Sequence, residues 1–306
     1  MTRIAVFAYS DTGHACLKLL LERRERVVFV GTHRDVPGEK LWYPSVAELA
    51  RGHGLETHVV ENPLDPQAIA RLRIASPDLL FSFYYRRVLP DEMTSAAKLG
   101  AWNIHGSLLP KYRGRAPVNW AVLKGETRTG ATLHAMTSRA DAGAIVDQEP
   151  VPIGPDDAAI DVQRRVTAAA AAILGRRIDE LKAGTAKTTP QDETQATRFG
   201  QRRPEDGRID WSRPAKEVHD LVRAVTHPYP GAFTDLFGGK TFVWRSRLPG
   251  LAAHDNFPGE VRGEEGRLYV TCGDDHFIEL LRLQPEGGAE IDGARFLAER
   301  KSGCAS

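Results

Sequence analysis

Residues 4–21 read Ile4-Ala5-Val6-Phe7-Ala8-Tyr9-Ser10-Asp11-Thr12-Gly13-His14-Ala15-Cys16-Leu17-Lys18-Leu19-Leu20-Leu21, and they give the clearest indication of the fold class. The apolar run at 4–9 is typical of a buried β-strand. Residues 10–13 form a turn rich in helix-capping side chains, and apolar residues then recur at helical spacing through Cys16, Leu17, Leu20 and Leu21. The stretch therefore predicts a strand, a turn and a helix.

The same alternation continues over the first hundred residues. Further strands are predicted at 27–31, 57–60, 78–84 and 101–104, with helices at 45–52 and 66–74. Strands that alternate with helices predict a Rossmann-like α/β domain, built on a mostly parallel sheet with helices on both faces. In such a sheet, ligands bind beyond the carboxyl ends of the strands.

The second half of the chain changes to short strands. Residues 158–183 are Ala-rich and predict one long helix, whereas residues 184–201 are polar and aperiodic. An amphipathic helix at 215–225 precedes strand-like runs at 232–236, 241–244, 259–262, 268–272 and 277–283. We expect a catalytic domain at 1–189, a linker at 190–204 and a small antiparallel, barrel-like (OB-like) β domain at 205–306.

Composition argues against several classes of protein. The 306 residues carry 41 Lys and Arg against 40 Asp and Glu, so nucleic acid is an unlikely partner, because binding its backbone needs a basic surface. Three widely spaced cysteines without metal-ligand spacing support neither a disulfide framework nor a metal site, and they favour the cytoplasm. No apolar run reaches the ~18–20 residues of a membrane span, so no membrane partner is expected.

Three polar side chains supply the chemistry of an acyl transfer. Asn103 and His105 are two residues apart at the end of a predicted strand, so their side chains leave it on the same face. An amide can stabilise an oxyanion, an imidazole can move protons, and the carboxylate of Asp141 can orient and charge the imidazole. Each also has a structural alternative: a packed histidine, a turn-capping amide or a turn former.

A basic run follows the histidine. Lys111, Arg113 and Arg115 alternate with Tyr112 and Gly114. The run is either a solvated loop or an anion site, for the phosphates of a nucleotide substrate or the carboxylates of a cofactor tail. The loop at 8–13 lacks both the G-x-G-x-x-G and the P-loop pattern, so nucleotide-dependent redox or phosphoryl chemistry is poorly supported.

One motif resembles a known family. It reads Asn103-Ile104-His105-Gly106-Ser107-Leu108-Leu109-Pro110, with Tyr112-Arg113-Gly114 and a later Asp141-Ala142-Gly143, and it resembles the 10-formyltetrahydrofolate-dependent formyltransferases. Within that family the chain is most similar to UDP-4-amino-4-deoxy-L-arabinose formyltransferases, the formyltransferase half of a bifunctional polymyxin-resistance protein. The similarity covers nearly the whole chain and includes Pro37-Gly38-Glu39-Lys40.

The resemblance implies formyl transfer from 10-formyltetrahydrofolate to the 4-amine of a nucleotide-linked amino sugar, a step in lipid A modification. Asn103 would stabilise the transition state, His105 would shuttle protons, and Asp141 would favour the protonated form of the histidine. No metal ion would be required. Folate contacts are implied at Arg87, Val88, Leu89, Arg115, Thr137, Ser138, Arg139, Ala140 and Asp141. The candidate contacts of the sugar nucleotide are Tyr9, Ser10, Lys111, Tyr112 and Arg113.

Two other interpretations stay open. Methionyl-tRNA formyltransferases share the trio and the two-domain layout, but holding tRNA usually calls for a basic insertion; here the segment 33–45 is short and the net charge is +1. A non-catalytic folate- or nucleotide-binding homologue is the second. The exact amino sugar, the oligomeric state, and whether the chain is a stand-alone enzyme or half of a bifunctional protein also stay open.

Overall fold

The computed structural model describes residues 1–34, 41–253 and 256–303. The chain divides into two compact units. The first comprises Met1–Pro117, Arg128–Pro152 and Gln163–Gly200, and the second comprises Val118–Thr127, Ile153–Val162 and Gln201–Ser306.

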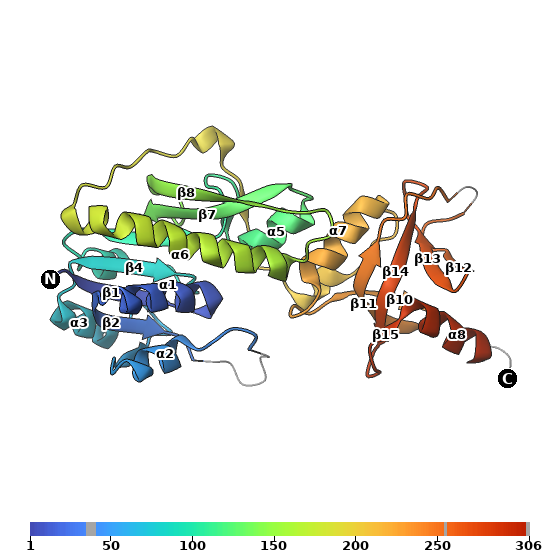
Figure 1. Ribbon diagram of the computed structural model, residues 1–306, viewed down its shortest axis with the longest axis horizontal. Helices are drawn as coiled ribbons and strands as arrows, with labels where there is room; N and C mark the ends of the chain where they lie inside the picture. Colours follow the sequence, from blue (N-terminus) through green and yellow to red (C-terminus); the bar gives the residue numbers. More distant parts are fainter. Residues whose placement is uncertain (35–40, 254–255, 304–306) are drawn as a thin grey trace. The chain divides into compact units, whose positions relative to one another are not determined.

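A seven-stranded sheet forms the centre of the first unit, with the strand order β3-β2-β1-β4-β5-β7-β8 (Figure 1). The first five strands in this order are parallel, and β7 and β8 are added antiparallel. The bounds are β1 Arg3–Ala8, β2 Arg26–Thr32, β3 Thr57–Val59, β4 Leu79–Phe83, β5 Ala101–His105, β7 Arg128–Ala135 and β8 Ile145–Pro152. The predicted Rossmann-like, mostly parallel sheet is confirmed.

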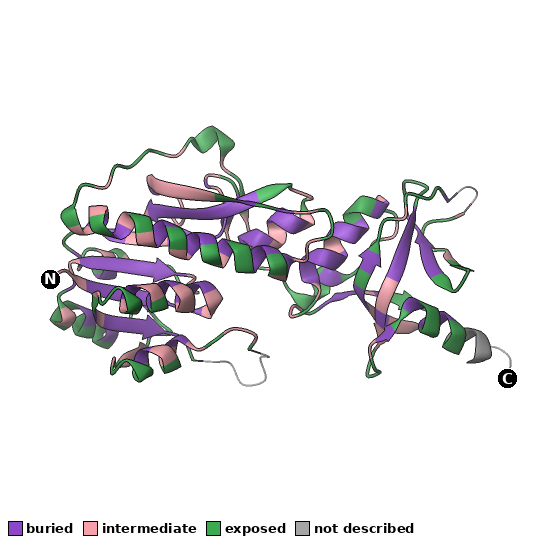
Figure 2. Cartoon of the chain, viewed as in Figure 1, coloured by how far each residue is buried: buried purple, intermediate pink, exposed green. Residues whose placement is uncertain are grey.

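Helices cover both faces of this sheet. On one face α1 (Ser10–Glu22) lies beside α6 (Ala159–Ala183), and the hydroxyls of Thr12 and Thr167 share a hydrogen bond of 2.8 Å. The remaining helices of the unit are α2 Val46–Gly52, α3 Pro66–Ala75 and α4 Asp91–Thr94. Strands covered in this way are buried on both sides, as Figure 2 shows for β1 and β4.

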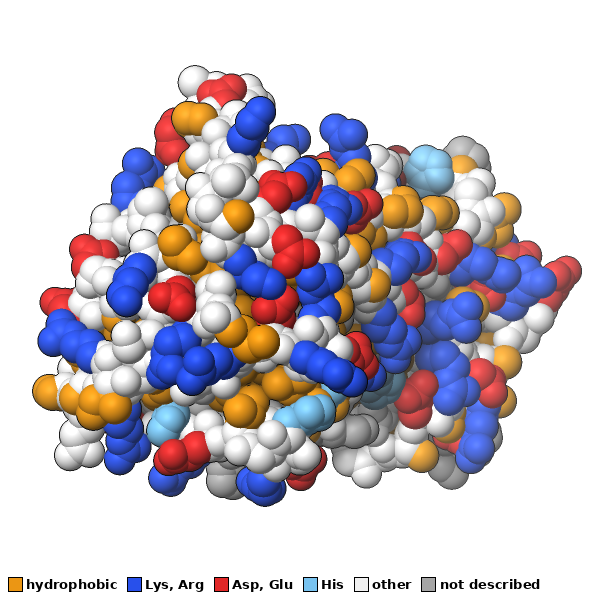
Figure 3. Space-filling model, turned by 60° about the vertical axis from the view of Figure 1, so that its left-hand side comes forward, with side chains coloured by type: hydrophobic (Ala, Val, Ile, Leu, Met, Phe, Trp, Pro, Cys, Tyr) orange, Lys and Arg blue, Asp and Glu red, His pale blue; other side chains and the backbone are white. Residues whose placement is uncertain are grey.

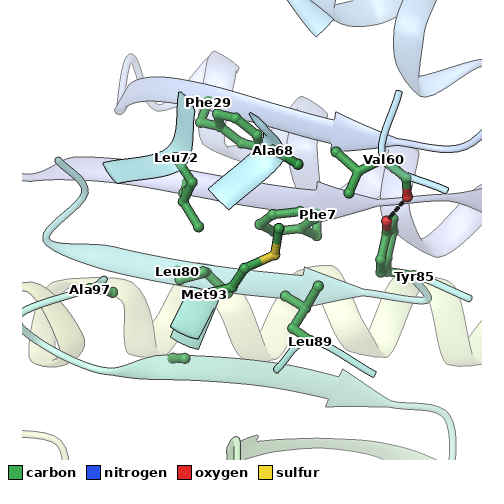
Figure 4. Packing of buried hydrophobic residues seen from close by; sticks show 12 residues of the cluster. Phe7, Phe29, Val60, Ala68, Leu72, Leu80, Tyr85, Leu89, Met93 and Ala97 are labelled. Carbon is green, nitrogen blue, oxygen red and sulfur yellow. Dashed lines mark hydrogen bonds between the residues drawn. The ribbon is translucent and has the colours of Figure 1, made fainter. Parts of the chain in front are cut away.

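The core on the opposite face joins strands to α3 and α4 (Figure 4). Phe7 and Leu80 from the sheet pack with Leu72 of α3 and Met93 of α4, and all four are fully buried. Side chains alternate along a strand, so this face takes every second residue of β1. Each large apolar side chain buried in this way contributes roughly 1.5–3 kcal/mol to stability.

The second unit contains an antiparallel sheet with the strand path β10-β11-β14-β13-β12, and β15 pairs with β14. The bounds are β10 Ala232–Leu236, β11 Gly239–Arg247, β12 Val261–Glu264, β13 Arg267–Thr271, β14 Phe277–Pro285, β15 Ile291–Asp292, α5 Pro117–Leu123, η2 Pro204–Gly207, α7 Ala215–Val225 and α8 Gly293–Gly303. The predicted antiparallel β domain is confirmed. Its strand pairing, over the described part of the chain, forms an open path and not a closed barrel.

The sequence did not predict β7 and β8. β8 carries Pro150 and Pro152, which disfavour a strand, but β8 lies at the edge of the sheet, where proline is tolerated. The range expected as a linker, 190–204, contains η1 (Glu193–Gln195) and β9 (Arg198–Phe199), and β9 pairs with β6 (Arg113–Gly114). Among residues 1–34, 41–253 and 256–303, no helix is both long and apolar enough to cross a membrane.

Candidate active site

Asn103 and His105 lie on β5, the last parallel strand of the sheet. Their two-residue spacing puts both side chains on one face, and His105 is the final residue of the strand. Gly106 follows, at a point where the hydroxyl of Tyr84 leaves no room for a β-carbon. The structure therefore places both residues at the carboxyl end of a strand, where open α/β sheets bind ligands.

The side chain of Asn103 is held by His134, its neighbour on β7. The antiparallel register pairs the two residues, and the amide nitrogen of Asn103 lies 3.0 Å from Nε2 of His134. Nδ1 of His134 donates to the carbonyl of Ala135 at 2.8 Å, so Nε2 acts as the acceptor. Burial lowers the pKa of His134 to about 4, which keeps the ring neutral at pH 7. This hydrogen bond fixes the plane of the Asn103 amide.

His105 is held by a backbone carbonyl. Its Nε2 lies 2.8 Å from the carbonyl oxygen of Tyr112, which only accepts, so Nε2 keeps its hydrogen in both protonation states. The nitrogen that gains and loses a proton is therefore Nδ1, which lies 3.6 Å from Oδ1 of Asp141. The two side chains are only 8% and 13% exposed, so solvent screens their attraction weakly. The pair can take up and return one proton at Nδ1.

Asp141 is positioned by its backbone and by Gly114. Its φ of +60° lies in the left-handed region, and its Oδ2 accepts the N–H of Gly114 at 2.9 Å. Burial alone would raise the pKa of Asp141, but the imidazoles of His105 and His134 and the Gly114 hydrogen bond outweigh it and hold the pKa below its ordinary value. Asp141 is therefore ionised at neutral pH.

The loop that supplies the Tyr112 carbonyl and the Gly114 N–H is itself fixed by β9. The rings of Tyr112 and Phe199 stack with centroids 5.1 Å apart. Gly114 has a φ of +101°, and a β-carbon there would collide with the carbonyl oxygen of Phe199, so the position requires glycine. Residues distant in sequence therefore set the groups that orient His105 and Asp141.

The predicted basic run divides into buried and exposed members. Arg113 is 5% exposed, and its guanidinium binds Gln191 and Glu193. Lys111 is exposed, and the exposed Arg115 donates to the Arg86 carbonyl at 3.0 Å. The guanidinium of Arg113 is thus already bound by Gln191 and Glu193, whereas Lys111 and Arg115 carry their charged groups at the surface.

Tyr9 and Ser10, two further predicted contacts, line a hollow beyond the carboxyl ends of β1 and β2. The other lining residues are Thr32, His33, Tyr43, Pro44, Ser45, Val46 and Ala47. The guanidinium of Arg86 lies 4.4 Å above the Tyr9 ring. Burial lowers the pKa of His33, whose Nε2 accepts the backbone N–H of Arg86 at 3.1 Å. The hollow is therefore aromatic and polar.

The predicted folate segments follow β4 and β7, the two strands that border β5. After β4, Arg87 and Val88 are exposed, whereas Leu89 is buried in the core cluster. After β7, the exposed members are Thr137, Ser138 and Arg139, followed by the half-buried Ala140. This second segment returns to the face of the sheet and brings Asp141 to His105.

His134, Gln191 and Thr197 also hold the site, and the sequence did not predict these roles. His134 was missed because β7 was not recognised, and its pairing with Asn103 depends on strand register. Gln191 and Thr197 lie in the segment that was interpreted as a linker, although its polar residues were a usable signal of binding to other loops. The motif Pro37–Lys40 lies outside the described residues.

Charges of both signs are interspersed over the face shown in Figure 3. Over the described ranges, no three His, Cys, Asp or Glu side chains gather closely enough to hold a metal ion. The candidate site is thus composed of an amide, two imidazoles and a carboxylate.

Solved structures of sugar N-formyltransferases share the fold. WlaRD, a sugar 3N-formyl transferase crystallised with dTDP and 5-N-formyl-THF, is 18% identical with a TM-score of 0.70, over 94% of this chain and 99% of its own. The N-formyltransferase from Helicobacter canadensis, in complex with folinic acid and dTDP-3-aminofucose, is 19% identical with a TM-score of 0.72, over 92% and 99%. A sugar N-formyltransferase from Shewanella sp. FDAARGOS_354 is 19% identical with a TM-score of 0.63, over 79% and 96%.

Two family models match the sequence itself. The formyl transferase model matches residues 3–178, and the model of the formyl transferase C-terminal domain matches residues 202–301. The first match alone spans more than half of the chain, and the two matches follow the order of a parallel-sheet region and an antiparallel β region. This chain therefore belongs to the formyl transferase family, which confirms the family and the enzyme class that the sequence predicted.

Proposed function

We propose that this enzyme transfers the formyl group of 10-formyltetrahydrofolate to the 4-amine of a nucleotide-linked amino sugar, with UDP-4-amino-4-deoxy-L-arabinose as the first candidate. The observation that carries the proposal is the joint placement of Asn103, His105 and Asp141, with Nδ1 of His105 3.6 Å from the carboxylate. The relatives solved with 5-N-formyl-THF or folinic acid, and with dTDP or a dTDP-amino sugar, support a folate donor and a sugar-nucleotide acceptor.

The reaction exchanges one bond and moves one proton. The unprotonated amine attacks the formyl carbon, and the bond from that carbon to N10 of the folate breaks. Asn103 and the protonated His105 stabilise the charge that develops on the formyl oxygen, a role in which one lost donor costs ~10²–10³ in rate. The protonated His105 gives the proton on its Nδ1 to N10 as that bond breaks, and Nδ1 then takes up the proton that the amine loses, while Asp141 stabilises the imidazolium.

The surrounding residues divide between the two substrates. We assign the hollow beside Tyr9 and Ser10, with the exposed Lys111, to the sugar nucleotide. Arg115 and the loops of Arg87–Leu89 and 137–140 are assigned to the folate, with Leu89 contributing through its backbone because its side chain is buried. Arg113 would act by positioning, since Gln191 and Glu193 already bind its guanidinium.

The runner-up is formylation of methionyl-tRNA. The net charge of +1 favours a sugar nucleotide over tRNA. The decisive assay incubates the purified protein with 10-formyltetrahydrofolate and, separately, UDP-4-amino-4-deoxy-L-arabinose, a dTDP-3-amino sugar and charged initiator tRNA. Formylation of the UDP sugar supports the proposal and a role in lipid A modification. Preference for either other acceptor would reject the UDP-aminoarabinose assignment.

A further inference from the structure

Residues 191–199, here called the strap, contact both loops that hold the catalytic histidine and aspartate. Gln191 contacts the loop of Asp141, and Thr197 and Phe199 contact the loop of Tyr112 and Gly114. All of these residues belong to the first unit. The strap therefore connects two chain segments whose relative position sets the distance from His105 to Asp141.

The side-chain amide of Gln191 makes hydrogen bonds at both of its ends. Its Nε2 donates to the carbonyl oxygens of Asp141 and Gly143, each at 2.8 Å. Its Oε1 accepts from Nη2 of Arg113 at 2.7 Å and from Nε at 3.2 Å. Since a primary amide has two hydrogens and one oxygen, this single side chain ties the turn of Asp141 to Arg113.

Arg113 passes this restraint to the groups on the catalytic pair. It stands between Tyr112, whose carbonyl binds His105, and Gly114, whose N–H binds Asp141. Its guanidinium also forms a two-point pair with Glu193, at 3.0 and 2.8 Å. Such paired contacts fix direction as well as distance.

Thr197 secures the other side of the same loop. Its hydroxyl accepts the N–H of Tyr112 at 2.9 Å, and its carbonyl accepts the N–H of Arg113 at 2.9 Å. Tyr112 and Asp141 both have left-handed backbones, with φ of +59° and +60°. Conformations of this kind persist only where surrounding contacts hold them.

We propose that Gln191 is a positioning residue for the His105–Asp141 pair. Without its two donated hydrogen bonds, the turn of Asp141 loses the contacts that hold its left-handed backbone, and the carboxylate moves away from the Gly114 N–H and from Nδ1 of His105. The kinetic consequence of this inference rests on the proposed formyl transfer; the structural consequence does not.

The test compares Gln191→Met and Gln191→Glu with a matched control, Gln195→Met, on the exposed part of the strap. Gln191→Met removes both N–H donors and the oxygen acceptor of the amide. Gln191→Glu keeps an oxygen that can accept from Arg113 but removes both N–H donors. Amide hydrogen exchange of Gly114, measured by NMR, reports whether Asp141 still accepts its N–H. Exchange of Leu80, in the core strand β4, reports global stability.

Both Gln191 variants are expected to speed Gly114 exchange roughly tenfold without changing Leu80 exchange. They should lower kcat roughly tenfold, because the catalytic pair loses the contacts that align it. Gln195→Met should match the wild type. Unchanged Gly114 exchange in a folded Gln191→Glu protein would overturn the inference. If the wild type formylates none of the acceptors, the proposed function fails, but the exchange comparison still decides the role of Gln191.

Discussion

Two pairs of side chains make up the site, and they are held in different ways. Asn103 and His134 lie opposite each other on adjacent strands, so the β5–β7 hydrogen-bond ladder sets their distance. His105 and Asp141 come from a strand end and a loop, and their separation depends on the Tyr112 carbonyl, the Gly114 N–H and the strap. Strand register positions the first pair directly, whereas the second pair needs side chains from a distant segment.

The largest loss of kcat is expected when one catalytic side chain is removed from either pair. Asn103→Ala and His105→Ala are each expected to lower kcat ~10²–10³-fold, because each removes a group that stabilises charge only in the transition state. Formyl-transfer kinetics measure the loss, and thermal melting checks that the fold is intact. A folded variant with wild-type kcat would exclude its residue from the mechanism.

The pair Asn103–His134 should also make the free energy of unfolding depend on pH. His134 binds a proton near pH 6.5 when unfolded but only near pH 4 when folded, so the unfolded state binds more protons between these values. Stability contributed by His134 is therefore full above about pH 6.5 and falls as the pH drops towards 4, by roughly 2 kcal/mol at pH 5. Urea unfolding of the wild type and of His134→Gln at pH 7 and 5 measures the contribution of His134 to the free energy of unfolding. The other histidines contribute equally in the two proteins. The same loss in both proteins would contradict the assignment.

A third change tests what His134 does for Asn103. His134→Phe removes the acceptor and is expected to lower kcat roughly tenfold, whereas His134→Gln keeps a side-chain oxygen as acceptor and should stay closer to the wild type. Steady-state kinetics on both variants give the comparison. Equal losses would mean that ring packing, and not the hydrogen bond, positions Asn103.

The smallest effect is expected outside both pairs. Lys111 is exposed, so its attraction for the phosphates of the acceptor is screened by solvent. Lys111→Ala should raise KM for the sugar nucleotide about threefold and leave kcat unchanged, which initial rates at varied acceptor concentration will show. A fall in kcat with unchanged KM would move Lys111 from binding to the catalytic step.

Much of the fold could be predicted, because the spacing of apolar residues and the turn residues within each segment indicate its secondary structure. The helix at Ala215–Val225 and the strand at Ala232–Leu236 agree with the predicted bounds, since amphipathic spacing and turn residues mark both ends. β7 was not predicted because its sequence, RTGATLHA, has few of the β-branched or aromatic residues typical of strands. With β7 unrecognised, no sequence argument could bring His134 to Asn103.

The alternating parallel sheet, the antiparallel β region, the family, and the position of Asn103 and His105 at a strand end could all be predicted from the amino-acid sequence. These features depend on residues close together in the chain, whose spacing can be read directly. Three further features became visible only in the folded chain: which histidine binds Asn103, which nitrogen of His105 faces Asp141, and that the strap already binds the guanidinium of Arg113. Those contacts join residues 31 and 78 positions apart, or depend on a fixed backbone carbonyl, and strand register and packing set them.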